Sequence, residues 1–351
     1  LLGSDRLHKH EVHGLVSVPE GCGDQLDHIE LRETRARAHN LPTGAVVQAT
    51  HEMLHQLSTL KQEDLAFVLI TGGASALLES PQAHISLQSL VRLTKTLSHA
   101  GVDIQTLNTI RCMTSRVKAG GFAKACTAGS LIVLVLSDVL DDSLEVIGSG
   151  PCIPHIVDPL AIERILLDSN ISQDDRELLS KSLYEYVINH NTASHHQTHS
   201  SDWVTPKGCR VTHLTLGTNA LAVKAASAAS SALGYEIFSA TTNTLSQTAN
   251  TVGSRLATSL RTMVSLDTTN NCPQALLEGG EATVHVPLNH GVGGRNQHTV
   301  VAAANAILVD QKHEWPTDTL IASFGTDGED GPTSAAGGFI DADVAKLLVS
   351  Q

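Results

Sequence analysis

The stretch AFVLITGGASALLES, residues 66–80, joins a short apolar run to a loop of glycine and serine. The run AFVLI has the length and composition of a buried strand, and the TGGAS that follows is typical of a tight turn. The same order returns where SLIVLVL (130–136) runs into SDVLDD, and where TLIASF (319–324) runs into GTDGEDGPTSAAGG. Strands that end in small polar residues are therefore the repeated feature of this sequence.

Apolar runs and helical stretches alternate along the chain, which predicts an α/β fold with a largely parallel sheet. Aromatic residues make up only 3% of the chain against 41% hydrophobic residues, so the core must be built from Leu, Val, Ile and Ala. That composition suits parallel strands covered by helices. The other predicted strands are 12–18, 211–216, 235–240 and 281–286, and helices are predicted over 44–60, 86–100, 159–168 and 220–233.

The loops after these strands are candidates for anion binding. In open α/β sheets, ligands bind beyond the carboxyl ends of the strands. Small residues there let backbone N–H groups approach an anion. A further loop, LNHGVGGRNQH (288–298), places Arg295 among glycines, and a guanidinium group suits two-point contact with a carboxylate or phosphate. Each loop alone also fits an ordinary turn, but the recurrence after several strands favours binding.

Charge and composition argue against several classes of protein. A net charge of −13 repels nucleic acid and anionic membranes. Six irregularly spaced cysteines without a C-x-x-C pair indicate reduced thiols in an intracellular protein. No apolar run approaches the roughly 18–20 residues of a membrane span. We therefore expect a cytoplasmic location, with the mitochondrion as the alternative. The polar composition of residues 191–208 predicts a linker there.

Five segments in a fixed order carry a family likeness: LITGGASALL (69–78), NTIRCMTSRVKAGG (108–121), LSDVLDDSLEVIGSGP (136–151), LEGGEATVHVPLNHGVGGRNQ (277–297) and FGTDGEDGPTSAAGG (324–338). Together they resemble the class II glycerate kinase family, whose C-terminal part is called the MOFRL domain. The segment SVPEG (17–21) is most similar to animal members. The resemblance implies a Rossmann-like parallel-sheet domain over 1–204 and a smaller α/β, MOFRL-like domain over 205–351, with the active site between them.

The resemblance also implies that the sequence is a fragment lacking both family termini. Family members begin with a strand leading into a Gly-Lys-Ala turn and end with a Thr-Gly-Thr-Asn segment, and neither is present here. The lysine of that turn is regarded as central to the family's site. We therefore expect residues 1–351 alone to be poorly soluble and inactive.

As for activity, the resemblance implies ATP- and Mg²⁺-dependent phosphorylation of D-glycerate, with 2-phosphoglycerate favoured over 3-phosphoglycerate, in serine and fructose metabolism. ATP and D-glycerate are then the partners, and a homo-oligomer is left open. Carried onto this sequence, the catalytic residues are Lys118, Asp138 and Arg295, and the Mg²⁺ ligands are Asp138 and Asp327, with Asp142 and Asp330 as further candidates. The residues expected to contact the nucleotide are Gly72, Gly73, Ser75, Ser149, Gly150, Glu281, Asn296, Asp327 and Asp330. These residue types fit phosphoryl transfer, which depends on charge neutralisation and in-line positioning.

Departures from the family pattern keep a non-catalytic paralogue open as an alternative. Ala74 and Ala119 stand where the family has glycine, and the other departures are Asp141, Cys152 and His298. A zinc hydrolase is a weaker alternative, because HEMLH (51–55) matches H-E-x-x-H. We expect these histidines to lie on a helix without a shared metal, with Met53 and Leu54 facing apolar residues. A dinucleotide oxidoreductase is disfavoured because GCGDQL and GVGGRN both lack the last glycine of G-x-G-x-x-G.

Overall fold

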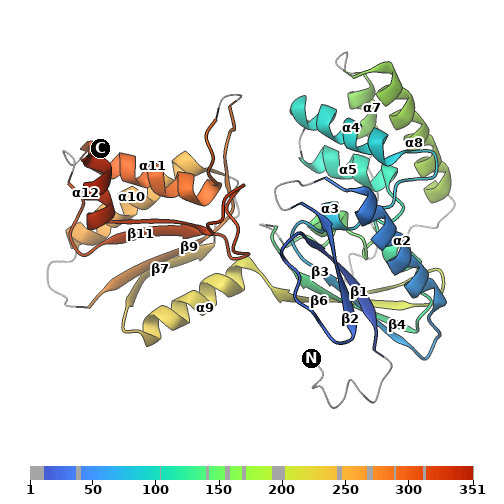
Figure 1. The fold of residues 1–351 in the computed structure, drawn as a ribbon, viewed down its shortest axis with the longest axis horizontal. Coiled ribbons are helices and arrows are strands. Elements are labelled where there is room, and N and C mark those ends of the chain that lie inside the picture. Colours follow the sequence, from blue (N-terminus) through green and yellow to red (C-terminus); the bar gives the residue numbers. More distant parts are fainter. Residues whose placement is uncertain are drawn as a thin grey trace. The chain divides into compact units, whose positions relative to one another are not determined.

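The computed structural model describes residues 12–36, 41–102, 104–139, 142–154, 159–167, 171–191, 202–242, 247–266, 272–287, 290–310 and 314–350. The chain forms two compact units, Leu1–Gly217 and Thr218–Gln351 (Figure 1). The division follows β6 (Arg210–Gly217), whereas the boundary expected at residue 204 precedes that strand.

The first unit is built on a sheet with the strand order β3-β4-β6-β5. Strands β3 (Leu65–Ile70), β4 (Ser130–Leu136) and β6 are parallel, and the short β5 (Trp203–Val204) is antiparallel to β6. Ile70 pairs with Val135, so the loops after β3 and β4 leave the same edge of the sheet. This arrangement confirms the strands predicted over 66–70, 130–136 and 211–216.

A second, two-stranded parallel sheet lies in the same unit. It pairs β1 (Gly14–Pro19) with β2 (Ile29–Arg35). The predicted strand at 12–18 is β1, whereas β2 was not predicted. Its sequence IELRETR alternates charged residues with few apolar ones, so its apolar signal is weak.

The helices of the first unit belong to two cores. Helix α2 (Gly44–Thr59), whose first turn is capped by Thr43 Oγ1, buries Val46, Ala49 and Leu57, and Leu57 packs in the core beside the β3 and β4 side chains. A separate helical core joins α4 (Leu87–His99), α5 (Ile104–Thr114), α7 (Pro159–Leu166) and α8 (Gln173–Asn191), which group together in Figure 1. The short elements α3 (Ala74–Leu77), α6 (Gly121–Lys124) and η1 (Ile147–Ser149) complete the unit.

The second unit combines parallel and antiparallel pairs. Strand β7 (Glu236–Thr242) is parallel to β9 (Gln274–Gly279), β8 (Gln247–Thr248) is parallel to β10 (Ala282–Thr283), and β11 (Leu320–Phe324) is antiparallel to β12 (Gly337–Asp341). Its helices are α9 (Asn219–Ala232), α10 (Ala249–Leu266), α11 (Arg295–Asp310) and α12 (Ala342–Val349). The core lies between α10, α11 and the β11–β12 hairpin. The two units together confirm the predicted α/β class.

Three local predictions need correction. The stretch predicted as a strand over 281–286 forms only the two-residue β10, and Val286 is exposed. Residues 192–201 of the expected linker lie outside the described part of the chain, but 203–204 form β5, and Trp203 Nε1 donates to the Cys152 carbonyl at 2.9 Å. The loop predicted over 288–298 ends early, because α11 begins at Arg295. Among the described residues, no helix is long and apolar enough to cross a membrane.

Candidate functional site

The glycine-rich loop follows β3, as the sequence predicted, and both of its glycines are required by their surroundings. A Cβ on Gly72 would lie 2.4 Å from Asp138 Oδ2, so a side chain there would displace the carboxylate. Gly73 has a φ of +77° and precedes α3, a left-handed conformation that favours glycine. The loop therefore presents bare backbone beside the Asp138 carboxylate, at the carboxyl end of the parallel strands.

A left-handed turn at Gly148, Ser149 and Gly150 supports this loop. All three residues have positive φ, at 62°, 62° and 61°. A non-glycine residue such as Ser149 is strained in this region by on the order of 1–3 kcal/mol. The Ser149 hydroxyl is hydrogen-bonded to Ser75 Oγ at 3.0 Å, and the Ser149 carbonyl accepts from Ala119 N at 3.2 Å. Ser149 is fully buried, so it acts beneath the glycine-rich loop and not at its surface.

The buried side chain of Lys118 links the two loops through hydrogen bonds. Its Nζ donates to the carbonyls of Ser75 at 2.9 Å, Leu78 at 2.8 Å and Gly148 at 3.3 Å. The side chain is only 2% exposed, and this burial lowers the pKa of the ammonium group, while the nearby Glu79 carboxylate raises it. Because its three donors all meet backbone carbonyls, Lys118 fixes the shape of the loop that was expected to bind phosphate.

Two polar residues near Lys118 were missed by the sequence analysis. Glu79 is 3% exposed, and its Oε1 has no hydrogen-bond partner in the described part of the chain. Asn108 Oδ1 accepts from Arg111 Nη1 at 3.0 Å and from Ser149 Oγ at 3.4 Å. Asn108 begins one of the segments that carry the family likeness and Glu79 directly follows another, but nothing in their sequence spacing separates them from surface residues.

In the second unit, Asp330 caps the start of α11. Its two oxygens accept from the backbone N–H groups of Asn296 and Gln297, each at 2.9 Å, and from the side-chain amides of the same residues, each at 3.1 Å. Asp330 is 1% exposed. A Cβ on Gly294 would lie 2.2 Å from its Cγ, so that glycine is needed for the contact. With both oxygens occupied, Asp330 positions the helix and is not open to a nucleotide or metal ion.

Arg295 and Asp327 are at the surface of the same unit. Arg295 Nη1 forms an ion pair with Glu281 Oε1, and the two side chains are 47% and 44% exposed. Asp327 is exposed, and its Oδ1 accepts from Glu329 N at 3.1 Å. Asn296 Oδ1 accepts from Ser323 Oγ at 2.7 Å, which ties the start of α11 to β11. Because this ion pair is exposed, an anionic ligand can replace Glu281 as the partner of Arg295.

Two family matches cover much of the chain. Residues 3–181 match the family described as Domain of unknown function (DUF4147), and residues 274–351 match the MOFRL family. The D-glycerate 2-kinase of Thermotoga maritima is 33% identical over 325 residues, which cover 92% of this chain and 70% of that protein. The chain belongs to the glycerate kinase family.

Other relatives come from animals and archaea. The glycerate kinase of Homo sapiens is 30% identical, and the matched region covers 98% of this chain and 72% of that protein. The glycerate 2-kinase of Pyrococcus horikoshii is 31% identical, with 95% and 71% covered. A crystal structure of a glycerate kinase from Thermotoga maritima superposes with a TM-score of 0.74 at 30% identity, over 96% of this chain and 75% of that one.

The predicted site residues of this glycerate kinase family member fall into two clusters, one in each unit. The first unit holds Gly72, Gly73, Ser75, Lys118, Asp138, Ser149 and Gly150, and the second holds Glu281, Arg295, Asn296, Asp327 and Asp330. Within each cluster, hydrogen bonds or close approaches link most of the members. Sequence spacing alone could not separate the exposed members from the buried ones that support them.

The backbone accommodates one family departure, Ala74, and is unfavourable for another, Ala119. Ala74 is the first residue of α3 and packs against the core of the sheet, so its methyl group is accommodated. Ala119 has a φ of +49°, a strained conformation for alanine, and is 6% exposed. Asp141 lies outside the described residues, whereas Asp142 also has a positive φ, +54°, and its Oδ1 has no hydrogen-bond partner in the part that the structure describes.

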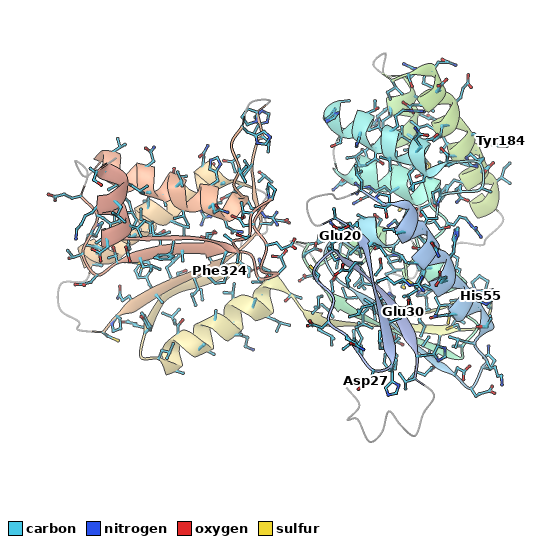
Figure 2. All side chains as sticks on the ribbon, in the orientation of Figure 1. Glu20, Asp27, Glu30, His55, Tyr184 and Phe324 are labelled. Atoms are coloured by element: carbon cyan, nitrogen blue, oxygen red, sulfur yellow. The ribbon has the colours of Figure 1, made fainter. Side chains whose placement is uncertain are left out.

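The HEMLH segment lies on α2 and belongs to the packing of the first unit. His51 is hydrogen-bonded to Ser80 Oγ at 3.0 Å, and His55 is exposed on the outer surface of the helix (Figure 2). Met53 and Leu54 pack against the core of the sheet, as predicted. Across the described ranges, no three His, Cys, Asp or Glu side chains are grouped to hold a metal ion.

Proposed function

We propose that this protein transfers the γ-phosphoryl group of ATP to the 2-hydroxyl of D-glycerate, forming 2-phosphoglycerate and ADP. The relatives named D-glycerate 2-kinase and glycerate 2-kinase support both the reaction and the position. One structural observation carries the proposal: the bare backbone of Gly72 and Gly73 lies against the Asp138 carboxylate at the carboxyl end of a parallel sheet. That arrangement brings an anion-binding loop next to an acidic side chain.

The chain's own residues supply binding and positioning. The glycine-rich loop lets phosphate oxygens approach backbone N–H groups. Arg295 can exchange Glu281 for the carboxylate of glycerate or a phosphate oxygen. Lys118, Ser149 and Asp330 are buried, so we assign them to positioning. Asp138 is exposed beside the loop and is suited to orient the glycerate hydroxyl and to accept its proton.

The residues present fit a magnesium ion. Mg²⁺ in phosphoryl-transfer sites is held by one or two carboxylates, with waters and the phosphates of the nucleotide as further ligands. Asp138 and Asp327 are exposed carboxylates in loops of that kind, and neither belongs to a closed cage of protein ligands within the described residues. When bound, the ion neutralises charge on the transferred phosphoryl group. If Asp138 binds it, then the hydroxyl must be oriented by another group.

The test is direct analysis of the product. The purified full-length protein is incubated with ATP, Mg²⁺ and D-glycerate, and ³¹P NMR identifies the phosphorylated carbon. We expect glycerate-dependent formation of 2-phosphoglycerate, its loss when EDTA removes the divalent ion, and little reaction with L-glycerate. ATP binding without any glycerate-dependent ADP release would overturn the proposed reaction, and a product phosphorylated at carbon 3 would overturn the assigned position.

A further inference from the structure

We propose that Arg35 is a further binding residue of this site and contacts an oxyanion held over the glycine-rich loop, either the triphosphate of ATP or the carboxylate of glycerate. Arg35 is the last residue of β2 and was not singled out by any sequence pattern. The proposal rests on the proposed function, because it assigns one more contact to the same ligands.

The first step is the position of the guanidinium group. A Cβ built on Gly73 would have Arg35 Nη2 as its nearest neighbour, at 3.4 Å. The guanidinium therefore lies against the backbone of the loop, at the residue next to Gly72. On Gly72 the corresponding neighbour is Asp138 Oδ2. A cation thus lies beside Gly73, and a carboxylate lies beside Gly72.

The second step is the chemistry of that pairing. A phosphate group bound with a divalent ion needs a cation for its free oxygens and a carboxylate for the ion. A guanidinium group is planar and always charged, and its donors match two oxygens of a phosphate or carboxylate. Arg35 supplies the cation beside Gly73, and Asp138 supplies the carboxylate beside Gly72. Lys118 cannot take the place of Arg35, because its three donors already meet carbonyls beneath the loop.

The third step is burial. Arg35 is only 7% exposed, and a buried charge is unfavourable unless it is hydrogen-bonded or paired. Its Nη1 donates to the Ala36 carbonyl at 3.2 Å, which orients the guanidinium plane at the end of β2. A side chain held in this way loses little further freedom when it binds a ligand, which favours affinity. Burial also means that a purely structural role must be separated by experiment.

The same strand offers a matched control. Arg32 lies three positions earlier in the sequence of β2 and pairs with Glu30 and Glu52, each at 2.6 Å. No Arg32 atom lies within 4 Å of a Cβ built on Gly73. Arg32→Gln removes the same charge from the same strand. Arg35→Gln removes the proposed contact, and Arg35→Lys keeps the charge but loses the planar fork.

The experiment measures ATP binding by calorimetry without glycerate, the KM for ATP and for glycerate, and thermal stability. We expect Arg35→Gln to weaken ATP binding, or to raise the KM for glycerate, by tenfold or more. Arg35→Lys should show a smaller change of the same kind with Tm within a few degrees of wild type, and Arg32→Gln should leave both ligands unaffected. The ligand whose constant changes identifies the oxyanion.

Wild-type constants for both ligands in Arg35→Lys and Arg35→Gln, with both variants folded, would overturn the proposal. So would a loss of affinity confined to a variant whose Tm falls, since that pattern indicates a structural role. The calorimetric measurement needs no acceptor, so failure of glycerate phosphorylation and failure of the Arg35 contact give different results.

Discussion

At the scale of single residues, Gly72 gives the sharpest test of the glycine-rich loop. We predict that Gly72→Ala lowers kcat/KM by tenfold or more, because the new Cβ would lie 2.4 Å from Asp138 Oδ2 and must displace the carboxylate. Gly72 does not have a positive φ, so alanine can adopt its backbone conformation and the protein should still fold. Steady-state kinetics and a thermal melt on the same preparation separate the two effects.

Gly44→Ala is the matched control for that change. Gly44 begins α2, and a Cβ there would have no heavy atom within 4 Å. Its kinetics should match wild type, and its stability should rise by about 0.4–1 kcal/mol because the unfolded chain loses freedom. Gly72→Ala with wild-type kinetics would mean that the Asp138 carboxylate need not lie where it does for turnover.

Arg295 is the second residue whose chemistry can be isolated. We predict that Arg295→Lys lowers kcat/KM by tenfold or more, because a point charge cannot replace a planar fork. Loss of a charge-assisted contact of about 1.5–3 kcal/mol accounts for that factor. The side chain is half-exposed, so the substitution should leave the free energy of unfolding nearly unchanged. Unchanged kinetics would remove Arg295 from the site.

Residue identity and loop composition did not separate exposed candidate side chains from buried ones. Asp138 and Asp330 both follow strands in Asp-rich loops, and the sequence analysis gave both to the ligands. One is exposed and the other is a buried helix cap. The difference depends on which N–H groups lie opposite each carboxylate, and that is set by tertiary packing. Arg35 was missed for the same reason, because only the fold brings β2 to Gly73.

At the scale of elements, the contact between α10 and α11 depends on one glycine. We predict that Gly253→Ala destabilises the protein, although alanine favours a helix by about 1 kcal/mol over glycine. A Cβ there would lie 2.4 Å from Thr299 O and 2.8 Å from Ala303 N, and these backbone atoms move only if the helices separate. Overpacking of this kind costs about 1–3 kcal/mol, so the steric term should exceed the gain in propensity.

Urea unfolding followed through Trp315, which is buried in the core of the second unit, measures the effect. Ser254→Ala is the control, since Ser254 is exposed on the same helix and should change the free energy of unfolding by less than about 0.5 kcal/mol. A Gly253→Ala protein more stable than wild type would show that the two helices can move apart without loss of packing.

Elements with strong apolar runs were predicted well, and those without them were not. Strand β3, LAFVLI, is buried or half-buried at alternate positions, and most positions of β4, SLIVLVL, are buried. Both are almost entirely apolar. Strand β12, GGFID, has two glycines and is recognisable only by its antiparallel pairing with β11. The predicted strand at 281–286 failed because alternation of apolar and polar residues does not ensure a partner strand. Pairing is a property of the fold and not of the segment.

At the scale of the whole molecule, the thiols report the packing of the first unit. Cys112, Cys126, Cys152 and Cys209 are buried there, whereas Cys22 is exposed and Cys272, in the second unit, is partly exposed. None of the six, all of which lie among the described residues, forms a disulfide bond. Burial raises the pKa of Cys112 to about 12, so little of this thiol is ionised near pH 8.

We therefore predict that a thiol reagent such as DTNB, at pH 8, titrates two thiols quickly in the native protein and the remaining four only as the first unit opens. Trp203 gives an independent signal for the same event, because its Nε1 donates to the Cys152 carbonyl. In a Trp315→Phe variant, Trp203 is the remaining tryptophan of the two in the sequence. Across a urea series, release of the four buried thiols should then coincide with the change in its fluorescence. A thiolate must reach solvent before it can react. Rapid reaction of more than two thiols without denaturant, or thiol release well before the fluorescence change, would therefore contradict this packing of the first unit.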